Sequence, residues 1–253
     1  MTGPAAAGRR RLRRGPVAEL RAFLHAALVA PVTRDHAQTD AAFRRRRVVA
    51  AVALLCGSAV LAWALRIPPG DPAFSWATFL LAGIWSAGAL ASGPLHLGRA
   101  HTRAGGPDAL PIVQSLALGG LLVVVFALGA LVVAQVPALS AQVNAVLDHA
   151  RVGSLGLIAA IVAVNGIAEE LYFRGALYAA IGRRYAVTIT TAIYALTTAG
   201  TGNPMLVLAA ALLGLLTGLQ RRVTGGVLGP ILTHVIWSSS MLFLLPPILE
   251  TLA

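Results

Sequence analysis

The sequence predicts an all-α fold: a polytopic transmembrane helix bundle of about seven spans, with a basic N-terminal arm in the cytoplasm. The first observation behind this prediction is composition, because the 253 residues are 57% hydrophobic and only 11% charged. The second is that several apolar runs reach or approach ~20 residues, the length an α-helix needs to cross ~30 Å of hydrocarbon. A bilayer also excludes unpaired backbone groups, so the spanning part should be helical.

Seven apolar runs are candidate spans, and the fifth and sixth are short and joined by a turn-rich link at 199–204. The expected spans are 48–65, 74–97, 112–136, 155–180, 187–199, 205–219 and 227–245. The tail that begins at Pro246-Pro247 is too short to span again. We therefore expect one transmembrane domain over 48–253, preceded by an arm over 1–47.

The arm combines a basic start with an amphipathic segment. Five arginines lie between residues 9 and 14, and Pro16 then opens a segment, 17–29, with apolar side chains on one helical face. This pattern is typical of a helix that lies in the membrane interface. We expect the arm to contact anionic lipid headgroups.

The distribution of arginine predicts the orientation. The chain has no lysine, and 17 of its 20 arginines fall on one side of the seven-span scheme; Arg66 and Arg151 lie opposite and Arg174 lies within a span. Basic residues stay in the cytoplasm, so the N-terminus is expected there, in a multi-pass protein of the cell membrane. Topology and lipid explain the net charge of +11, and a nucleic-acid partner is not expected.

Three ionisable residues lie inside the fourth span, in the string Glu169-Glu170-Leu171-Tyr172-Phe173-Arg174. Charges at this depth are costly and face a bundle interior or a wet cavity. Glu170 and Arg174 stand at i and i+4, so we expect an ion pair between them. Glu169 points ~100° away and is left available for chemistry, with Asn165 on its face.

Two other spans carry polar residues that could meet this helix. The fifth has Tyr194 and Thr198, and the seventh has His234 and Ser238, which share a face at i and i+4. We expect Glu169 to look across a gap toward His234. Simpler interpretations remain open: a buried glutamate hydrogen-bonded to a neighbouring helix, a packing histidine, and threonines that only join helices.

These motifs together resemble the CAAX-protease and bacteriocin-processing (CPBP or Abi) family of intramembrane endopeptidases. The resemblance covers about residues 112–245, and Gly214, Gly218 and Gly225-Gly226 also match the family pattern. It implies that Glu169 activates a water molecule together with a second-motif histidine. It also implies that the third motif stabilises the oxyanion of the tetrahedral intermediate.

The sequence departs from the family at two positions. The second motif, Phe-x-x-x-His, reads Tyr194 and Thr198 here, and the third, His-x-x-x-Asn, reads His234 and Ser238. The base keeps its carboxylate but loses its imidazole partner, and losing such a group commonly costs ~10²–10⁴-fold in rate. The candidate catalytic residues are Glu169, Glu170, Arg174, Thr198, His234 and Ser238.

The function expected from this resemblance is cleavage of a membrane protein or peptide. No cofactor is expected, and a metal is disfavoured because a catalytic zinc needs about three protein ligands and the sequence has no His-Glu-x-x-His. The main alternative is an inactive relative that serves as a membrane scaffold or binds lipid or a partner. A transporter ranks lower, because the first three spans carry few polar residues. The substrate and the oligomeric state are left open.

Overall fold

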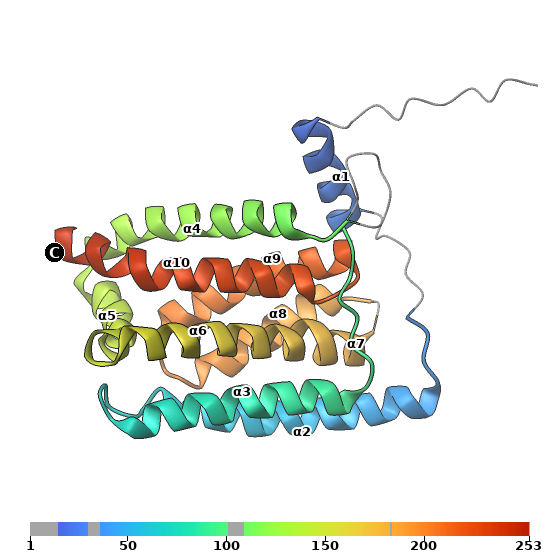
Figure 1. Cartoon of the computed structure of the whole chain (residues 1–253), viewed down its shortest axis with the longest axis horizontal. Helices are drawn as coiled ribbons and strands as arrows, with labels where there is room; N and C mark the ends of the chain where they lie inside the picture. The colour runs from blue at the N-terminus through green and yellow to red at the C-terminus, as the bar shows by residue number, and fades with distance from the viewer. Residues whose placement is uncertain (1–14, 30–35, 101–108, 183, 253) are drawn as a thin grey trace, which may run out of the picture.

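The computed structural model describes residues 15–29, 36–100, 109–182 and 184–252. In these residues, helices are joined by short loops, and one isolated bridge links Ala100 and Ala109. Most of the helices lie side by side along the long axis of the bundle (Figure 1). Their bounds are α1 Pro16–Leu28, α2 Asp40–Ala64, α3 Pro72–Ser92, α4 Ile112–Ala134, α5 Pro137–Val152, α6 Leu155–Glu170, the π-helix η1 Leu171–Leu177, α7 Tyr178–Ile181, α8 Ala186–Ala199, α9 Pro204–Thr224 and α10 Leu228–Leu252.

Within the part of the chain that the structure describes, six helical segments are long and apolar enough to cross a membrane: α2, α3, α4, the continuous run α6–α7, α9 and α10. The seventh expected span is α8, a shorter apolar helix of 14 residues. The carbonyl oxygen of Gly200, just after α8, accepts a hydrogen bond from Arg66, just after α2. The chain is a multi-pass helical bundle, and a scheme of about seven spans is close to what the structure contains.

Two expected boundaries differ from the structure. The first span begins earlier than residue 48, because Thr39 caps α2 by accepting a hydrogen bond from the Ala42 amide. The last helix continues through Pro246 and Pro247 to Leu252. Tertiary contacts hold this extension, since Leu249 is buried and Glu250 pairs with Arg151 at 3.4 Å.

Helix α6 is the centre of the bundle and contacts both α3 and α10. In Figure 1, α2 and α3 run along one side of α6 and α10 along the other, with α4 beyond α10. Helices α8 and α9 form a hairpin. The core between α3, η1 and α8 is aromatic, and its most buried members include Trp85, Tyr172, Phe173 and Tyr194.

The two ends of the bundle differ in charge. One end, which we call the arginine-rich end, holds the start of α2 with Arg44–Arg47 and the end of α9 with Arg221 and Arg222. The opposite end holds α5, an additional helix between α4 and α6. The His149 ring of α5 bonds to the Ile67 carbonyl oxygen at 3.0 Å, which ties α5 to the α2–α3 turn.

Helix α1 stands apart from the parallel helices at the arginine-rich end (Figure 1). Ala26 and Ala27 pack against Val223 of α9. The other face exposes an apolar stripe made of Val17, Leu20, Leu24 and Leu28. The helix expected in the arm is therefore present, whereas the basic stretch at 1–14 lies outside the described residues.

Candidate functional site

The helix that carries the paired glutamates changes its winding directly after them. The α-helix α6 ends at Glu170 and the π-helix η1 follows from Leu171. π-Helical turns are rare and occur frequently at functional sites. Tyr172 anchors this turn, since its ring stacks on Trp85 of α3 and its hydroxyl donates to the Ala50 carbonyl oxygen of α2 at 2.5 Å.

Glu170 and Arg174 form the ion pair expected from their spacing. Nη1 of Arg174 donates to Oε1 of Glu170 at 3.0 Å, and both side chains are almost completely buried. The guanidinium also lies over the Tyr194 ring, 4.9 Å from its centre. Gly214 of α9 makes room for this arrangement, because a Cβ there would lie 3.3 Å from both Arg174 and Tyr194.

His234 lies near both carboxylates, and its hydrogen bond goes to Glu170, a partner that the sequence does not predict. Its Nδ1 donates to Oε1 of Glu170 at 2.9 Å. The ring packs over Gly166 of α6, where a Cβ would lie 3.4 Å away, at ordinary contact distance. Oε1 of Glu170 thus accepts hydrogen bonds from His234 of α10 and from Arg174 of η1. The bond through Nδ1 directs Nε2 of the imidazole away from Glu170.

Glu169 has a different partner, the hydroxyl of Tyr194. The phenol of this α8 residue donates to Oε2 of Glu169, which is half-buried. His234, Glu170 and Arg174 all lie close enough to interact with Glu169 electrostatically. The carboxylate is not paired with an arginine by hydrogen bonds, so its second oxygen remains free to accept a proton.

Sequence reasoning did not anticipate the role of Tyr194. The residue was noted as the aromatic position of the second motif, where the family has phenylalanine. The extra hydroxyl of tyrosine was the signal, because a buried phenol requires a hydrogen-bond partner. The nearest polar residue on a facing span was Glu169.

Three other residues singled out by sequence are not joined to the carboxylates by hydrogen bonds in the structure. The hydroxyl of Thr198 donates to the Tyr194 carbonyl oxygen, and that of Ser238 to the Val235 carbonyl oxygen, so each bonds to its own helix. The Asn165 amide likewise donates to the Ile161 carbonyl oxygen at 3.0 Å. Because these three side chains bond to carbonyl oxygens of their own helices, other groups bind the two carboxylates.

Several buried polar atoms around the glutamates have no protein partner. They include Oε2 of Glu170, Nε and Nη2 of Arg174, Oδ1 of Asn165 and Nε1 of Trp237. Trp237 lies one turn after His234, with the two ring centres 5.9 Å apart. Buried polar atoms are normally hydrogen-bonded, so this cluster can hold water or the polar backbone of a bound peptide.

The titratable groups do not form a ready-made metal cage. Within the described residues, no three His, Cys, Asp or Glu side chains are grouped so that they could hold an ion. Glu169, Glu170 and His234 lie near one another, but the hydrogen bonds to Arg174 and Tyr194 occupy oxygens that would serve as ligands.

With this geometry, the comparison with known proteins can be stated. Residues 151–240 match the family model described as type II CAAX prenyl endopeptidase, Rce1-like. This segment of the chain is similar to that CAAX-protease family. The matched segment runs from the end of α5 into α10, so it contains both glutamates, Arg174, Tyr194, Thr198 and His234. No curated protein and no solved structure matches the chain.

The Rce1-like match agrees with the family resemblance that the sequence predicts. The Rce1-like match lies inside the segment, about 112–245, in which the resemblance was noted. The helices that precede it, α1 to α4, lie outside the match and complete the bundle around α6 and α10.

Proposed function

We propose that this CAAX-protease relative is an intramembrane endopeptidase in which Glu169 activates water. The observation that carries the proposal is the convergence of three helical segments on two adjacent carboxylates. Tyr194 of α8 binds Glu169, while Arg174 of η1 and His234 of α10 bind Glu170. Catalytic sites in helical bundles are built from such facing side chains.

In the proposed reaction, the Glu169 carboxylate takes a proton from a water molecule as its oxygen attacks the peptide carbonyl carbon. The carbonyl oxygen becomes an oxyanion, and His234 in its protonated form donates to it from Nε2. When the C–N bond breaks, Glu169 returns the proton to the leaving amine. Glu170 and Arg174 act as positioning residues that orient His234.

The proposal is tested by the variant Glu169→Gln, which keeps the size of the side chain and removes its basicity. Purified chain in lipid vesicles should cleave a membrane-spanning peptide, and the variant should lose this activity by about 10²-fold or more. Glu250→Gln makes the same chemical change at an exposed position of the opposite end and serves as control. Equal turnover by both variants would refute the role of Glu169.

A second candidate function is an inactive relative that binds lipid or a membrane partner. It is favoured by Thr198, whose hydroxyl bonds to its own helix where the family has the second-motif histidine. Thr198→His separates the two functions. A large gain of peptide cleavage, in a variant that still elutes as a folded protein, indicates a weakened protease; no gain favours a scaffold.

For localisation, we propose a protein of the cell membrane with the arginine-rich end in the cytoplasm. The support is the clustering of Arg44–Arg47, Arg221 and Arg222 at one end, since basic loops are retained in the cytoplasm. The exposed apolar stripe of α1 would then lie in the cytoplasmic leaflet, where the adjoining basic arm meets anionic lipid.

A further inference from the structure

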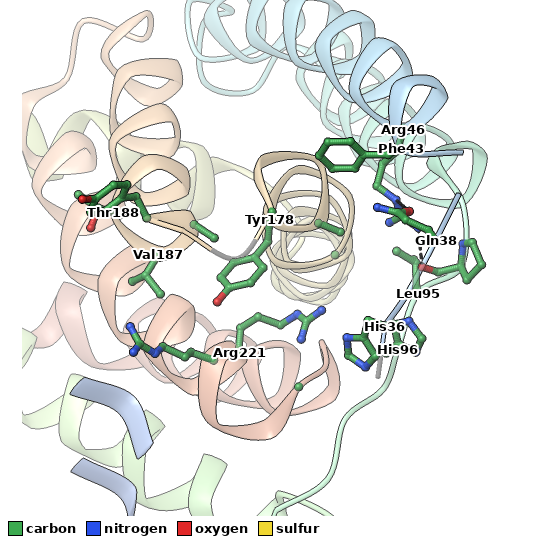
Figure 2. Close-up of a pocket in the computed structure, with 18 residues that line it drawn as sticks. His36, Gln38, Phe43, Arg46, Leu95, His96, Tyr178, Val187, Thr188 and Arg221 are labelled. Atoms are coloured by element: carbon green, nitrogen blue, oxygen red, sulfur yellow. Dashed lines mark hydrogen bonds between the residues drawn. The ribbon is translucent and has the colours of Figure 1, made fainter. Parts of the chain in front are cut away.

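The arginine-rich end contains a cavity of about 540 Å³ that is separate from the two glutamates. Its walls come from the segment before α2, the segment after α3, the turn around η1 and α7, and the end of α9. Figure 2 shows Arg46, Gln38 and Leu95 on one side, Arg221 beside Tyr178 in the middle, and Val187 and Thr188 on the far side. Glu169, Glu170 and His234 do not line it.

Arg46 is the most informative residue of this cavity. Only 4% of the residue is exposed, yet its charge has no carboxylate partner among the described residues. Nε donates to Oε1 of Gln38 at 3.2 Å and Nη2 to the Pro94 carbonyl oxygen at 3.0 Å. Nη1 is buried with no partner. A buried guanidinium bound only by neutral acceptors is costly, and an anion would offset that cost.

A second buried arginine faces the same cavity. Arg221 is 6% exposed, its Nε donates to the Arg174 carbonyl oxygen at 2.8 Å, and its guanidinium lies 5.1 Å from the centre of the Tyr178 ring. These contacts fix its side chain on the wall of the cavity. Arg222 also lines the wall, and no Asp or Glu occurs among the described lining residues.

Two stacked histidines lie beside these arginines. The His36 and His96 rings are parallel, with centres 3.7 Å apart. The pKa of His96 lies below its ordinary value because of partial burial and the positive charges of Arg221 and Arg46. Both guanidinium groups therefore lie near His96, in the same small region of the cavity. Its backbone is fixed too, since the Val227 amide donates to the His96 carbonyl oxygen at 2.9 Å.

We propose that this cavity binds a phosphate group through the Arg46 guanidinium, with Arg221 on another wall of the same cavity. Guanidinium forks suit phosphate oxygens, and they form hydrogen bonds roughly twice as strong as those between neutral groups. The cavity is larger than one phosphate ion, so a phosphate that carries a glycerol substituent also fits. Two sources share this chemistry, a lipid headgroup and free phosphate. The inference does not depend on proteolysis, because binding is measured without any substrate.

The first test measures the thermal unfolding midpoint of the full chain in uncharged detergent at constant ionic strength. Inorganic phosphate and short-chain phosphatidic acid are titrated separately, with short-chain phosphatidylcholine as the lipid control. A ligand that binds the folded chain raises the midpoint in a saturable manner. A response to inorganic phosphate identifies a free phosphate site, and a response to phosphatidic acid alone identifies a headgroup site; either supports the proposal.

Two variants assign the response to the cavity. Arg46→Gln should weaken the apparent affinity by about tenfold or more, because a charged donor is lost. Arg45→Gln removes the same charge from an exposed neighbour whose guanidinium contacts the Ala91 carbonyl oxygen, and it should behave as wild type. Gln38→Glu places a carboxylate of the chain beside Arg46, so it should compete with phosphate and weaken the apparent affinity. Gln142→Glu makes the same change at the opposite end and should leave the affinity unchanged.

Gln38→Glu keeps the test valid if Arg46→Gln does not fold, because the new ion pair satisfies the buried charge. The proposal is overturned if neither phosphate probe gives a saturable response, or if the response is unchanged in the variants that do fold. It is also overturned if neither phosphate probe raises the midpoint but a peptide with a free C-terminal carboxylate does, while the amidated peptide does not. That outcome would show that the cavity binds the C-terminus of a peptide.

Discussion

At Glu169, a single hydroxyl determines how the carboxylate is held. The Tyr194 phenol reaches it from α8, and the same ring supports the Arg174 guanidinium on its face. Tyr194 therefore contacts both members of the charged motif, although only its hydroxyl touches the proposed base. Mutation can test the contribution of the hydroxyl separately from that of the ring.

Tyr194→Phe removes the hydroxyl and keeps the ring. We expect kcat for peptide cleavage to fall by about tenfold or more with little change in KM, because a hydrogen bond to a charged group is worth ~1.5–3 kcal/mol. Tyr185→Phe is the matched control, since this exposed hydroxyl accepts a bond from Arg184 far from the carboxylates. An equal fall in both variants, or a change in KM alone, would argue against a positioning role.

Arg174 tests the buried pair. Replacing it by Met leaves the Glu170 charge without its cation, and breaking a buried ion pair in this way costs ~3–5 kcal/mol. The unfolding midpoint in detergent should fall markedly. Arg151→Gln, which breaks an exposed pair with Asp148, should change stability by ~0–1 kcal/mol. Similar midpoints for the two variants would contradict the structural importance of Arg174.

Residue spacing predicted only part of this site. The Glu170–Arg174 pair follows from i and i+4 on one helix, which is local geometry. Which of the two adjacent glutamates binds His234 depends on how α10 is rotated and how closely it packs against α6. This rotation and this closeness are properties of packing between helices distant in sequence.

At the scale of elements, small residues determine how closely helices approach. A Cβ at Gly57 of α2 would lie 2.3 Å from the Trp85 ring of α3, and one at Gly88 of α3 would lie 2.4 Å from the Ala53 Cβ. Close approach through small residues is the usual means of helix association in membranes. This contact places Trp85 against Tyr172 and so fixes the start of η1.

Gly88→Ala should therefore separate α2 from α3 and lower the unfolding midpoint, because neither backbone can yield without losing aromatic packing. Gly83→Ala on the same helix meets nothing within 4 Å. It should leave the midpoint unchanged or raise it, since alanine favours helix by ~1 kcal/mol over glycine. If Gly83→Ala lowered the unfolding midpoint and Gly88→Ala left it unchanged, this account of the α2–α3 contact would be wrong.

Hydropathy predicted which elements exist better than it predicted where they end. The span at 155–180 is helical as expected, but its change to π winding at Leu171 has no hydropathy signal. Proline usually ends a helix, so a stop before Pro246 was the natural expectation. The buried Leu249 and the Glu250–Arg151 contact instead keep α10 helical to Leu252.

At the scale of the whole molecule, two polar regions lie along the same central helix. The carboxylates lie at the end of α6, and the proposed phosphate cavity begins at Gly175 and Tyr178 a few residues later. Arg221 joins them through its bond to the Arg174 carbonyl oxygen. The rest of the bundle is mostly apolar toward the membrane, so both proposed activities are concentrated at and near the arginine-rich end.

The most direct test of the central claim is a comparison of membrane-protein fragments in cells that express wild type, Glu169→Gln or Glu250→Gln at equal levels. New peptide termini are mapped across the proteome by mass spectrometry. If Glu169 is the base of a membrane endopeptidase, one set of termini should be present with wild type and Glu250→Gln and absent with Glu169→Gln. Identical termini in all three cell lines would contradict the proposed hydrolytic function.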